Sequence, residues 1–566
     1  MSESPRKVII YQMMTRLFGN KVTTNKKYGS IEENGVGKFN DITPEALKAI
    51  RELGVTHIWY TGVIEHATLT DYSAYGIPGD DADVVKGRAG SPYAIKDYYD
   101  VSPDLAVDVR NRMGEFESLV TRTHEHGMKV IIDFVPNHVA RAYKSDARPP
   151  GVKDLGEDDT PAVAFDPKNN FYYLPGQSFT PPPAPADFSH PTLDGKFEEV
   201  PAKATGNDEF VAAPGPHSWY ETVKLNYGVD IINDRRTYFD PVPDTWFKMR
   251  DILRFWVGKG VDGFRCDMAE MVPVEFWEWI IPQLRATNPS IIFIAEIYNV
   301  SQYRTYLDRG KFDYLYDKVQ LYDTLRVLTE GQRSTSDVAK VRESLADISK
   351  HMLHFMENHD EQRIASRFFA GGPWRGIPAF VVSATIDSGP VMIYFGQEVG
   401  ETGEGAEGFQ GDDGRTTIFD YWGVPEHQKW MNGGKFDGAL LTEEQRQLRR
   451  FYSELLDFIA VNPAITSGEY ADLTPYISPE DASHKVHAFL RYHENERLIV
   501  ITSYNDHDLE ATFTIPPDLL RAMGLSTDEV YIARDMLWRE IEVGLDQKSS
   551  FSLKIKPFSS YILKIK

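Results

Sequence analysis

Two charged residues stand inside an otherwise apolar stretch near the middle of the chain. The segment GFRCDMAEM carries Arg265 and Asp267 two positions apart. Side chains alternate between the two faces of a β-strand, so both would point to one face, and Phe264 and Cys266 to the other. Taken alone, this pattern favours a plain buried ion pair.

Further polar residues follow other strand-like segments. IIFIAE ends in Glu296, ENHD ends in His359 and Asp360, and DFVPNH ends in Asn137 and His138. In parallel barrels the functional groups collect where strands end, so three acids, an arginine and two histidines would meet at one rim. Clustering like charges is costly and rarely serves stability, which favours a functional site over an ion pair.

Carboxyl groups paired at such a rim suggest cleavage of a glycosidic bond. Asp267 suits the nucleophile, because the nearby Arg265 favours the ionised carboxylate. Glu296 follows an apolar segment and suits the acid that must keep its proton. Asp360 would be a third acid that binds substrate hydroxyls and favours ring distortion. A separation of about 5–5.5 Å between the reacting carboxyl groups gives retention and a longer one inversion.

These residues need a scaffold in which strands and helices alternate. That alternation predicts a (β/α)8 TIM barrel. The alternative is an open doubly wound sheet, which is disfavoured because no glycine-rich phosphate loop follows the first strand. The expected strands are residues 8–12, 56–61, 129–135, 261–267, 291–297, 312–317, 354–359 and 391–397, and the clearest helices are residues 43–53, 244–259, 273–287 and 442–461.

Two further parts interrupt and follow the barrel, which we assign to residues 1–138 and 244–462. Residues 139–243 are rich in Pro, Gly, Asn and Asp. A structureless loop of that length is implausible, so we interpret it as an inserted subdomain after the third strand, beside the mouth of the barrel. Residues 463–566 contain short alternating strands and predict a C-terminal antiparallel β-sandwich.

The amino-acid composition limits the possible binding partners of the protein. The 566 residues carry a formal net charge of -23, which disfavours nucleic acid and anionic membranes because phosphate would be repelled. The single cysteine, Cys266, excludes an intrachain disulfide and a thiolate metal cluster. No apolar stretch is long enough to span a membrane, and the N-terminus lacks the apolar core of a signal peptide. We expect a monomer, cytoplasmic as the sequence stands or exported if a signal was removed.

The ordered motifs resemble those of the alpha-amylase family, family 13 of the glycoside hydrolases. They are GVTHIWYTGV, DFVPNH, KLNYGVD, GFRCDMAEM, IAE, FMENHD and GPVMIYFGQEVGE, and the resemblance covers almost the whole chain. It implies a retaining mechanism on α-glucans through a β-glycosyl-enzyme intermediate. By motif position Asp267 would be the nucleophile, Glu296 the general acid/base and Asp360 the transition-state stabiliser.

The resemblance also implies residues that bind the sugar. Arg265, His138 and His359 would contact the sugar at the bond being cut. Tyr93, in GSPYAIKDYY, takes the place of the family's stacking tyrosine, whose flat ring suits the CH face of a sugar. The alternative for Tyr93 is ordinary loop packing.

A structural calcium ion is a further implication. Asn137 matches a family residue that often binds Ca²⁺ between the barrel and the insertion. Oxygen ligands suit calcium, and residues 155–159 would supply further carboxylates. The alternative is that the Asn137 side chain caps its own loop.

One difference from the family pattern leaves more than one type of reaction possible. Glu270 and Met271 stand where true alpha-amylases often carry a Lys-His pair that contacts the leaving-side sugar. Our first hypothesis is a hydrolase of α-1,4 links in starch or maltooligosaccharides. The second is a transglycosylase or sugar isomerase of the same family. A non-catalytic carbohydrate-binding barrel is the third, and the presence of all three acids disfavours it.

Overall fold

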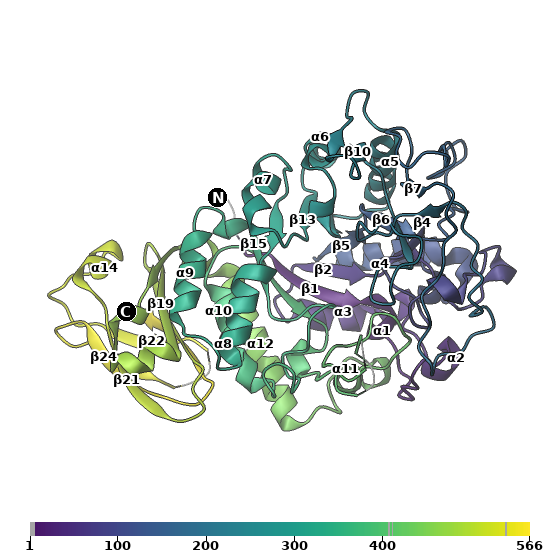
Figure 1. Ribbon diagram of the computed structural model, residues 1–566. Helices are drawn as coiled ribbons and strands as arrows, with labels where there is room; N and C mark the ends of the chain where they lie inside the picture. The colour runs from purple at the N-terminus through teal and green to yellow at the C-terminus, as the bar shows by residue number, and fades with distance from the viewer. Residues whose placement is uncertain (1–5, 406–407, 410, 538–539) are drawn as a thin grey trace.

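Parallel strands of the computed structural model close into a barrel, drawn in Figure 1. The structure describes residues 6–405, 408–409, 411–537 and 540–566. Neighbouring strands follow chain order around the barrel, with the last strand pairing with the first, and this confirms the predicted (β/α)8 fold. The barrel strands are β1 (Ile9–Met14), β2 (His57–Thr61), β5 (Lys129–Phe134), β12 (Gly263–Cys266), β13 (Ile292–Ala295), β14 (Tyr314–Tyr316), β15 (Met352–Phe355) and β16 (Val391–Tyr394).

Helices lie between the strands, and their ends have local causes. α3 begins after Thr43, whose side chain accepts the Ala46 N–H, and α12 begins with a capping box of Thr442 and Gln445. Within the described ranges, none of the helices is long and apolar enough to cross a membrane. The main helices are α3 (Pro44–Arg51), α4 (Arg112–Glu125), α5 (Asp244–Gly258), α6 (Val274–Arg285), α7 (Tyr303–Asp308), α8 (Asp323–Thr329), α9 (Ser336–Ser344), α10 (Ile377–Thr385) and α12 (Glu443–Val461).

Aromatic residues fix the strands of the site against the helix layer. The Phe134 ring of β5 lies 6.2 Å from Phe264 of β12 and 6.3 Å from Trp277 of α6. All three side chains are fully buried. Burying a phenylalanine contributes about 1.5–3 kcal/mol, so this packing holds the outward face of β12 firmly. The alternate residue Arg265 is thereby left on the inward face.

Short β-ribbons extend beyond the barrel strands. After β2 the chain forms the antiparallel pair β3 (Ile64–His66) and β4 (Ile95–Val101). Between β5 and α5, where the sequence indicates an inserted subdomain, the chain forms three two-stranded ribbons. They pair β6 (His138–Ala140) with β9 (Thr222–Lys224), β7 (Tyr173–Leu174) with β8 (Ala202–Lys203), and β10 (Val229–Asp230) with β11 (Arg236–Thr237).

The C-terminal part is an antiparallel β-sandwich, as predicted, and is the yellow lobe of Figure 1. Its two sheets enclose a separate hydrophobic cluster. The buried Arg491 fastens it to the barrel by donating to the carbonyls of Ile386, Ala464 and Ile465. One sheet has β17 (Glu469–Asp472), β19 (Val486–His493), β20 (Glu496–Ser503), β25 (Ser560–Ile565), β22 (Ile532–Asp535) and β23 (Glu542–Gly544), and the other has β18 (Ile477–Ser478), β21 (Leu509–Thr514) and β24 (Ser550–Ile555).

Candidate active site

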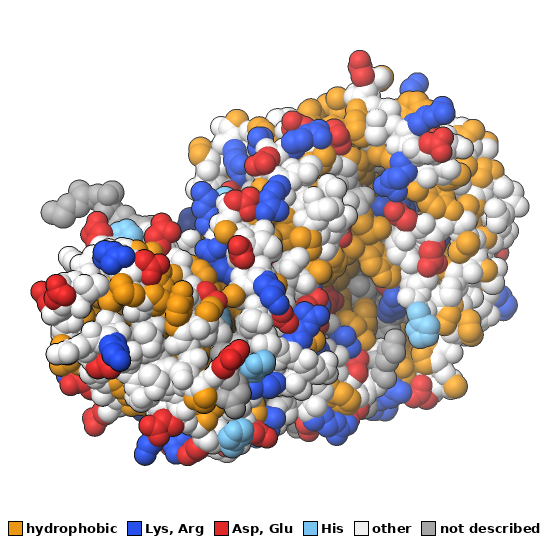
Figure 2. Space-filling view, turned by 60° about the vertical axis from the view of Figure 1, so that its left-hand side comes forward, with side chains coloured by type: hydrophobic (Ala, Val, Ile, Leu, Met, Phe, Trp, Pro, Cys, Tyr) orange, Lys and Arg blue, Asp and Glu red, His pale blue; other side chains and the backbone are white. Residues whose placement is uncertain are grey.

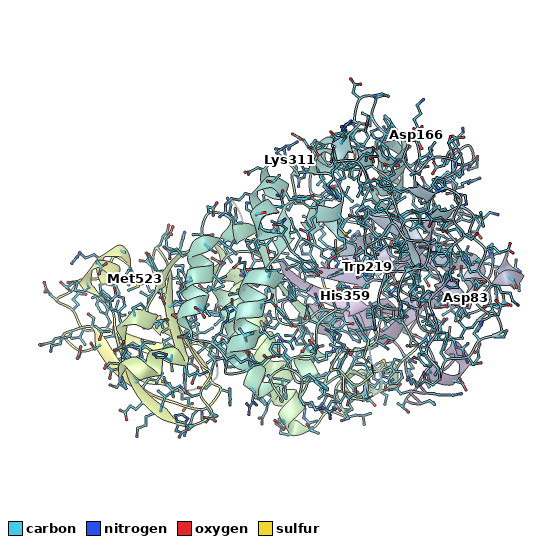
Figure 3. The ribbon with its side chains drawn as sticks, in the orientation of Figure 1. Asp83, Asp166, Trp219, Lys311, His359 and Met523 are labelled. Atoms are coloured by element: carbon cyan, nitrogen blue, oxygen red, sulfur yellow. The ribbon has the colours of Figure 1, made fainter. Side chains whose placement is uncertain are left out.

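A cavity of about 870 Å³ opens where the barrel strands end. Its lining includes Asp267, Glu296 and Asp360, together with Tyr93 and His138. Figure 2 shows the larger lobe hollowed, with hydrophobic side chains around the hollow. Figure 3 labels His359 within this lobe and Met523 in the sandwich, far along the molecule. Residues from three strand ends and from the insertion therefore line one cavity.

Arg265 links two of the acids. Its Nη1 lies 2.7 Å from Asp267 Oδ1, and its Nη2 lies 2.7 Å from Glu296 Oε1. The guanidinium is fully buried, and its Nε donates to the hydroxyl of Tyr316 at 3.2 Å. A plain ion pair would need one carboxylate, whereas this arginine holds two at fixed positions. A planar guanidinium suits that task because its donors form a rigid fork.

Asp267 has one oxygen without a hydrogen-bond partner in the described part of the chain. Arg265 occupies Oδ1, whereas Oδ2 has no hydrogen-bond partner among the described residues. His138 Nε2 lies 3.9 Å from Oδ2. Burial raises the pKa of Asp267, and the Arg265 charge opposes that rise. The side chain is thus oriented through Oδ1, and Oδ2 is buried without a hydrogen bond to the residues described.

Glu296 is held from three sides. Tyr298 donates its hydroxyl to Oε1 at 2.7 Å, and the Met268 N–H donates to Oε2 at 2.8 Å. Met268 has φ 43°, a left-handed conformation that costs roughly 1–2 kcal/mol and directs its N–H at the carboxyl group. Burial raises the pKa of Glu296, Arg265 opposes this, and the charge of Asp267 adds to it. Burial and the nearby Asp267 charge therefore favour a proton on Glu296.

The third acid lies beside a histidine and a tyrosine. Asp360 Oδ2 is 3.1 Å from His359 Nε2, and the Asp360 side chain is 35% exposed. The Gln12 amide nitrogen lies 2.8 Å from His359 Nδ1. Because an amide NH₂ only donates, His359 Nδ1 accepts, and His359 Nε2 carries the imidazole proton. Tyr93 stacks on His359 with ring centroids 5.2 Å apart. Limited solvation and then the charge of Glu296 raise the pKa of Asp360.

Both histidines have a lowered pKa, which favours the neutral imidazole. Burial, followed by the charge of Lys224, lowers the pKa of His138 to about 3. Burial and then Arg265 lower the pKa of His359 well below its ordinary value. A neutral imidazole can donate to a sugar hydroxyl without adding a positive charge beside Arg265.

At Asn137 an ammonium group takes the place expected for calcium. Lys224 Nζ donates to Asn137 Oδ1 and to the Met271 carbonyl at 3.2 Å, and lies 2.7 Å from Asp208 Oδ1. Asn137 Nδ2 donates to the Gly206 carbonyl at 2.8 Å. These oxygens already surround one buried cation, so the residues present do not fit a calcium ion at Asn137.

The insertion acids proposed as further ligands are engaged locally. The Asp159 carboxylate accepts the N–H groups of Asn170 and Phe171 and the hydroxyl of Tyr173. Three donors on one carboxylate stabilise its charge and order the surrounding loop. Asp159 therefore has a structural task within the insertion.

Sequence reasoning missed three residues of the site. Tyr298 binds Glu296, Tyr316 binds Arg265, and Lys224 binds Asn137. Tyr316 ends the sixth barrel strand, so the rule that found the acids applied to it as well. Glu270, noted for its departure from the family pattern, accepts the N–H groups of Tyr298 and Asn299 and so holds the loop after β13.

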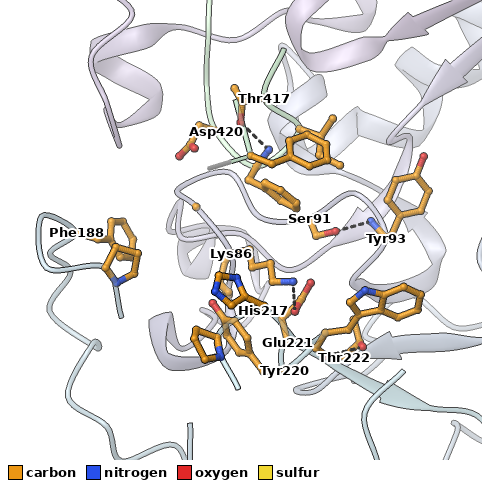
Figure 4. A pocket seen from close by; sticks show the side chains of 18 of the residues that line it. Lys86, Ser91, Tyr93, Phe188, His217, Tyr220, Glu221, Thr222, Thr417 and Asp420 are labelled. Atoms are coloured by element: carbon orange, nitrogen blue, oxygen red, sulfur yellow. Dashed lines mark hydrogen bonds and ion pairs between the residues drawn. The ribbon is translucent and has the colours of Figure 1, made fainter. Parts of the chain in front are cut away.

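The cavity wall away from the acids carries several aromatic rings among polar side chains (Figure 4). Phe188 and Tyr220 come from the insertion, and their rings would cover the apolar faces of sugars. Lys86 Nζ lies 3.1 Å from Glu221 Oε2, a pair that Figure 4 marks with a dashed line. Rings combined with a few charged groups are typical of carbohydrate sites.

The barrel, the insertion and the acids at one rim are typical of enzymes that act on glycosidic bonds. A model of the alpha-amylase catalytic domain matches residues 25–433. The chain belongs to the alpha-amylase family, family 13 of the glycoside hydrolases.

Relatives and solved structures agree with this family. The chain is 23% identical to Alpha-amylase 3 of Dictyoglomus thermophilum over 74% of this chain and 75% of that one. It is 24% identical to an alpha-1,4-glucan:maltose-1-phosphate maltosyltransferase of Cereibacter sphaeroides over 52% of this chain and 40% of that one. The maltogenic alpha-amylase AmyB of Thermotoga neapolitana has the same fold, with TM-score 0.62, 19% identity and 98% coverage of both chains. The chain spans less than two thirds of several other curated relatives.

Proposed function

We propose that this protein is a retaining glycoside hydrolase that cleaves α-1,4-glucosidic bonds of maltooligosaccharides and starch. One observation carries the proposal: Arg265 holds Asp267 and Glu296 at 2.7 Å each, beside the cavity that Asp360 also lines. Two carboxyl groups held this close together support action on one glycosidic bond. The α-1,4 linkage rests on the names of the alpha-amylase relatives.

In the first step Asp267 Oδ2 attacks the anomeric carbon. The bond from that carbon to the glycosidic oxygen breaks as the new carbon–oxygen bond forms. The proton of Glu296 passes to the leaving oxygen, so the shortened chain departs as a neutral alcohol. Tyr298 and the Met268 N–H stabilise the carboxylate that remains on Glu296.

In the second step a water molecule attacks the same carbon. Glu296, now ionised, accepts the proton of the water as the bond to Asp267 breaks. Two inversions at one carbon give net retention, and the first product is the α-anomer. His138, His359 and Asp360 would hold the sugar hydroxyls, and the Tyr93 ring its apolar face.

Transglycosylation is the second candidate, because a sugar hydroxyl can replace the water. The maltosyltransferase and cyclomaltodextrin glucanotransferase relatives support it. Glu270 is tied to the loop after β13, so the acceptor-side contacts differ from those of a Lys-His pair.

Product analysis tests both candidates. Maltoheptaose, starch, pullulan and sucrose would each be incubated with the enzyme and followed by NMR of the anomeric protons. A hydrolase gives shorter α-anomers from maltoheptaose, and a transglycosylase also gives chains longer than the substrate. Initial release of β-anomers would contradict retention.

Asp267→Asn tests the nucleophile. The amide keeps the shape and can still accept from Arg265, but it lacks the ionised oxygen. We expect turnover of maltoheptaose to fall by a factor on the order of 10⁴, with the melting temperature little changed. Turnover close to that of the wild type would remove the assignment.

A further inference from the structure

A second group of carboxylates lies outside the active-site cavity. Glu65 is on β3, Asp100 on β4 and Asp146 in the loop after β6. One carboxylate oxygen from each lies within 4.8 Å of the others. Glu65 is 2% and Asp100 4% exposed, whereas Asp146 is exposed to solvent. The group therefore has a buried floor and an open side.

Glu65 Oε2 has no hydrogen-bond partner within the described ranges, whereas the carboxylates of Asp100 and the nearby Asp97 do. Glu65 Oε2 is buried and forms no hydrogen bond with any residue that the structure describes. Asp100 Oδ2 accepts from Arg112 Nε at 2.9 Å. The nearby Asp97 accepts from the Ser145 hydroxyl and from backbone N–H groups of the same loop.

The positive charges beside the group are already committed. Arg112 pairs with Asp100, and Lys96 pairs with Asp80 at 3.0 Å. An ionised carboxylate buried without a partner costs several kcal/mol, so proteins pair such groups or place a metal ion against them. The Glu65 carboxyl group faces two other acids, and a cation between them would be held by all three.

We propose that Glu65, Asp100 and Asp146 form a calcium-binding site. All three supply hard oxygen ligands, and the solvent-exposed side at Asp146 leaves room for the water molecules that complete six to eight ligands. The ion would join the β3–β4 ribbon to the first loop of the insertion. This position is separate from Asn137, where Lys224 already serves as the cation.

Calorimetric titration of the full-length, chelator-treated protein with calcium chloride tests the site. We expect the wild type to bind one equivalent and to gain melting temperature as the site fills. Glu65→Gln should lose this binding, and Asp146→Asn should weaken it at least tenfold. Asp234→Asn removes a carboxylate that is 88% exposed elsewhere in the insertion and should bind calcium as the wild type does.

If Glu65→Gln fails to fold because Glu65 is buried, the variant at the exposed Asp146 still tests the site. Absence of calcium binding by the wild type would overturn the proposal, since Glu65 would then be a protonated acid. Binding that survives unchanged in both Glu65→Gln and Asp146→Asn would overturn it as well, because the ion would lie elsewhere.

Discussion

At the residue scale, the site depends on how Arg265 divides its donors between two acids. The alternation of side chains along β12 was enough to place Arg265 and Asp267 on one face. It did not extend to Tyr298, which lies beyond the end of β13, where the chain turns and period-two reasoning no longer applies. Lys224 was missed for another reason: it contacts Asn137, just before β6, because β6 pairs with β9, and that pairing depends on the fold of the whole insertion.

Replacing Tyr298 by phenylalanine tests how Glu296 keeps its proton. The Tyr298 hydroxyl donates to the ionised form of Glu296 and so lowers its pKa. Without it the pKa of Glu296 rises further, and the proton is retained to higher pH. We expect the basic limb of the kcat/KM profile to shift to higher pH, with activity at the optimum within about tenfold of the wild type.

The pH profile distinguishes a role of Tyr298 in setting the pKa of Glu296 from a purely structural role. A purely structural role for Tyr298 would lower activity at all pH values and leave the basic limb in place. Tyr306→Phe removes a buried hydroxyl that donates to the Val272 carbonyl and serves as the matched control. Its basic limb should coincide with that of the wild type.

At the element scale, each of the barrel strands was predicted, but their ends were less certain. The seventh was expected over residues 354–359, whereas β15 covers Met352–Phe355. His359 and Asp360 therefore follow the strand in a bend rather than ending it. The ribbons of the insertion were not predicted individually, because two or three residues per strand carry too little periodicity.

Lys224→Met tests the ammonium group that joins β9 to the rim of the barrel. Methionine keeps the length but removes the charge, leaving Asn137 and Asp208 without their partner. Breaking a buried pair in this way costs about 3–5 kcal/mol, so we expect a lower free energy of unfolding in denaturant titrations. Lys153→Met removes a lysine that pairs with Asp158 at the surface and should have little effect.

Crystal diffraction tests independently whether calcium binds at Asn137. Anomalous scattering from a calcium-soaked crystal should show no peak within about 2.6 Å of Asn137 Oδ1, where Lys224 Nζ lies. A calcium peak at that position would restore the original expectation and contradict the structural assignment of Lys224.

The helix α11 (Pro425–Met431) contains a histidine whose charge state couples to stability. His427 Nε2 donates to the Phe18 carbonyl at 2.7 Å, and burial lowers its pKa to about 3. The unfolded chain binds this proton near pH 6.5, so the neutral form stabilises the fold above that pH. The stabilisation is lost as pH falls toward 3.

His427→Gln should therefore be most costly near neutral pH. The difference in free energy of unfolding between wild type and variant should shrink by about 1.4 kcal/mol per pH unit between pH 6 and 4. Urea titrations at these pH values measure it. A difference that stays constant would show that His427 does not titrate on unfolding in this range.

At the scale of the whole molecule, the cavity is assembled from segments that lie far apart in the sequence. Its lining runs from Tyr28 near the first strand, through Phe188 and Trp219 of the insertion, to Trp422 after β16. The sequence located the acids, because strand ends of a barrel meet at one rim. The aromatic wall could not be located in this way, since it depends on how the insertion folds over that rim.

The most direct test of the central claim is to trap the intermediate on the enzyme. Glu296→Gln would be mixed with α-maltosyl fluoride, whose leaving group needs little help from an acid. We predict that the intact mass rises by one maltosyl unit and that peptide mapping places it on Asp267, because no base remains to activate water. A label on another residue, or turnover with inversion and no label, would contradict the assignment of Asp267 and Glu296 to one anomeric carbon.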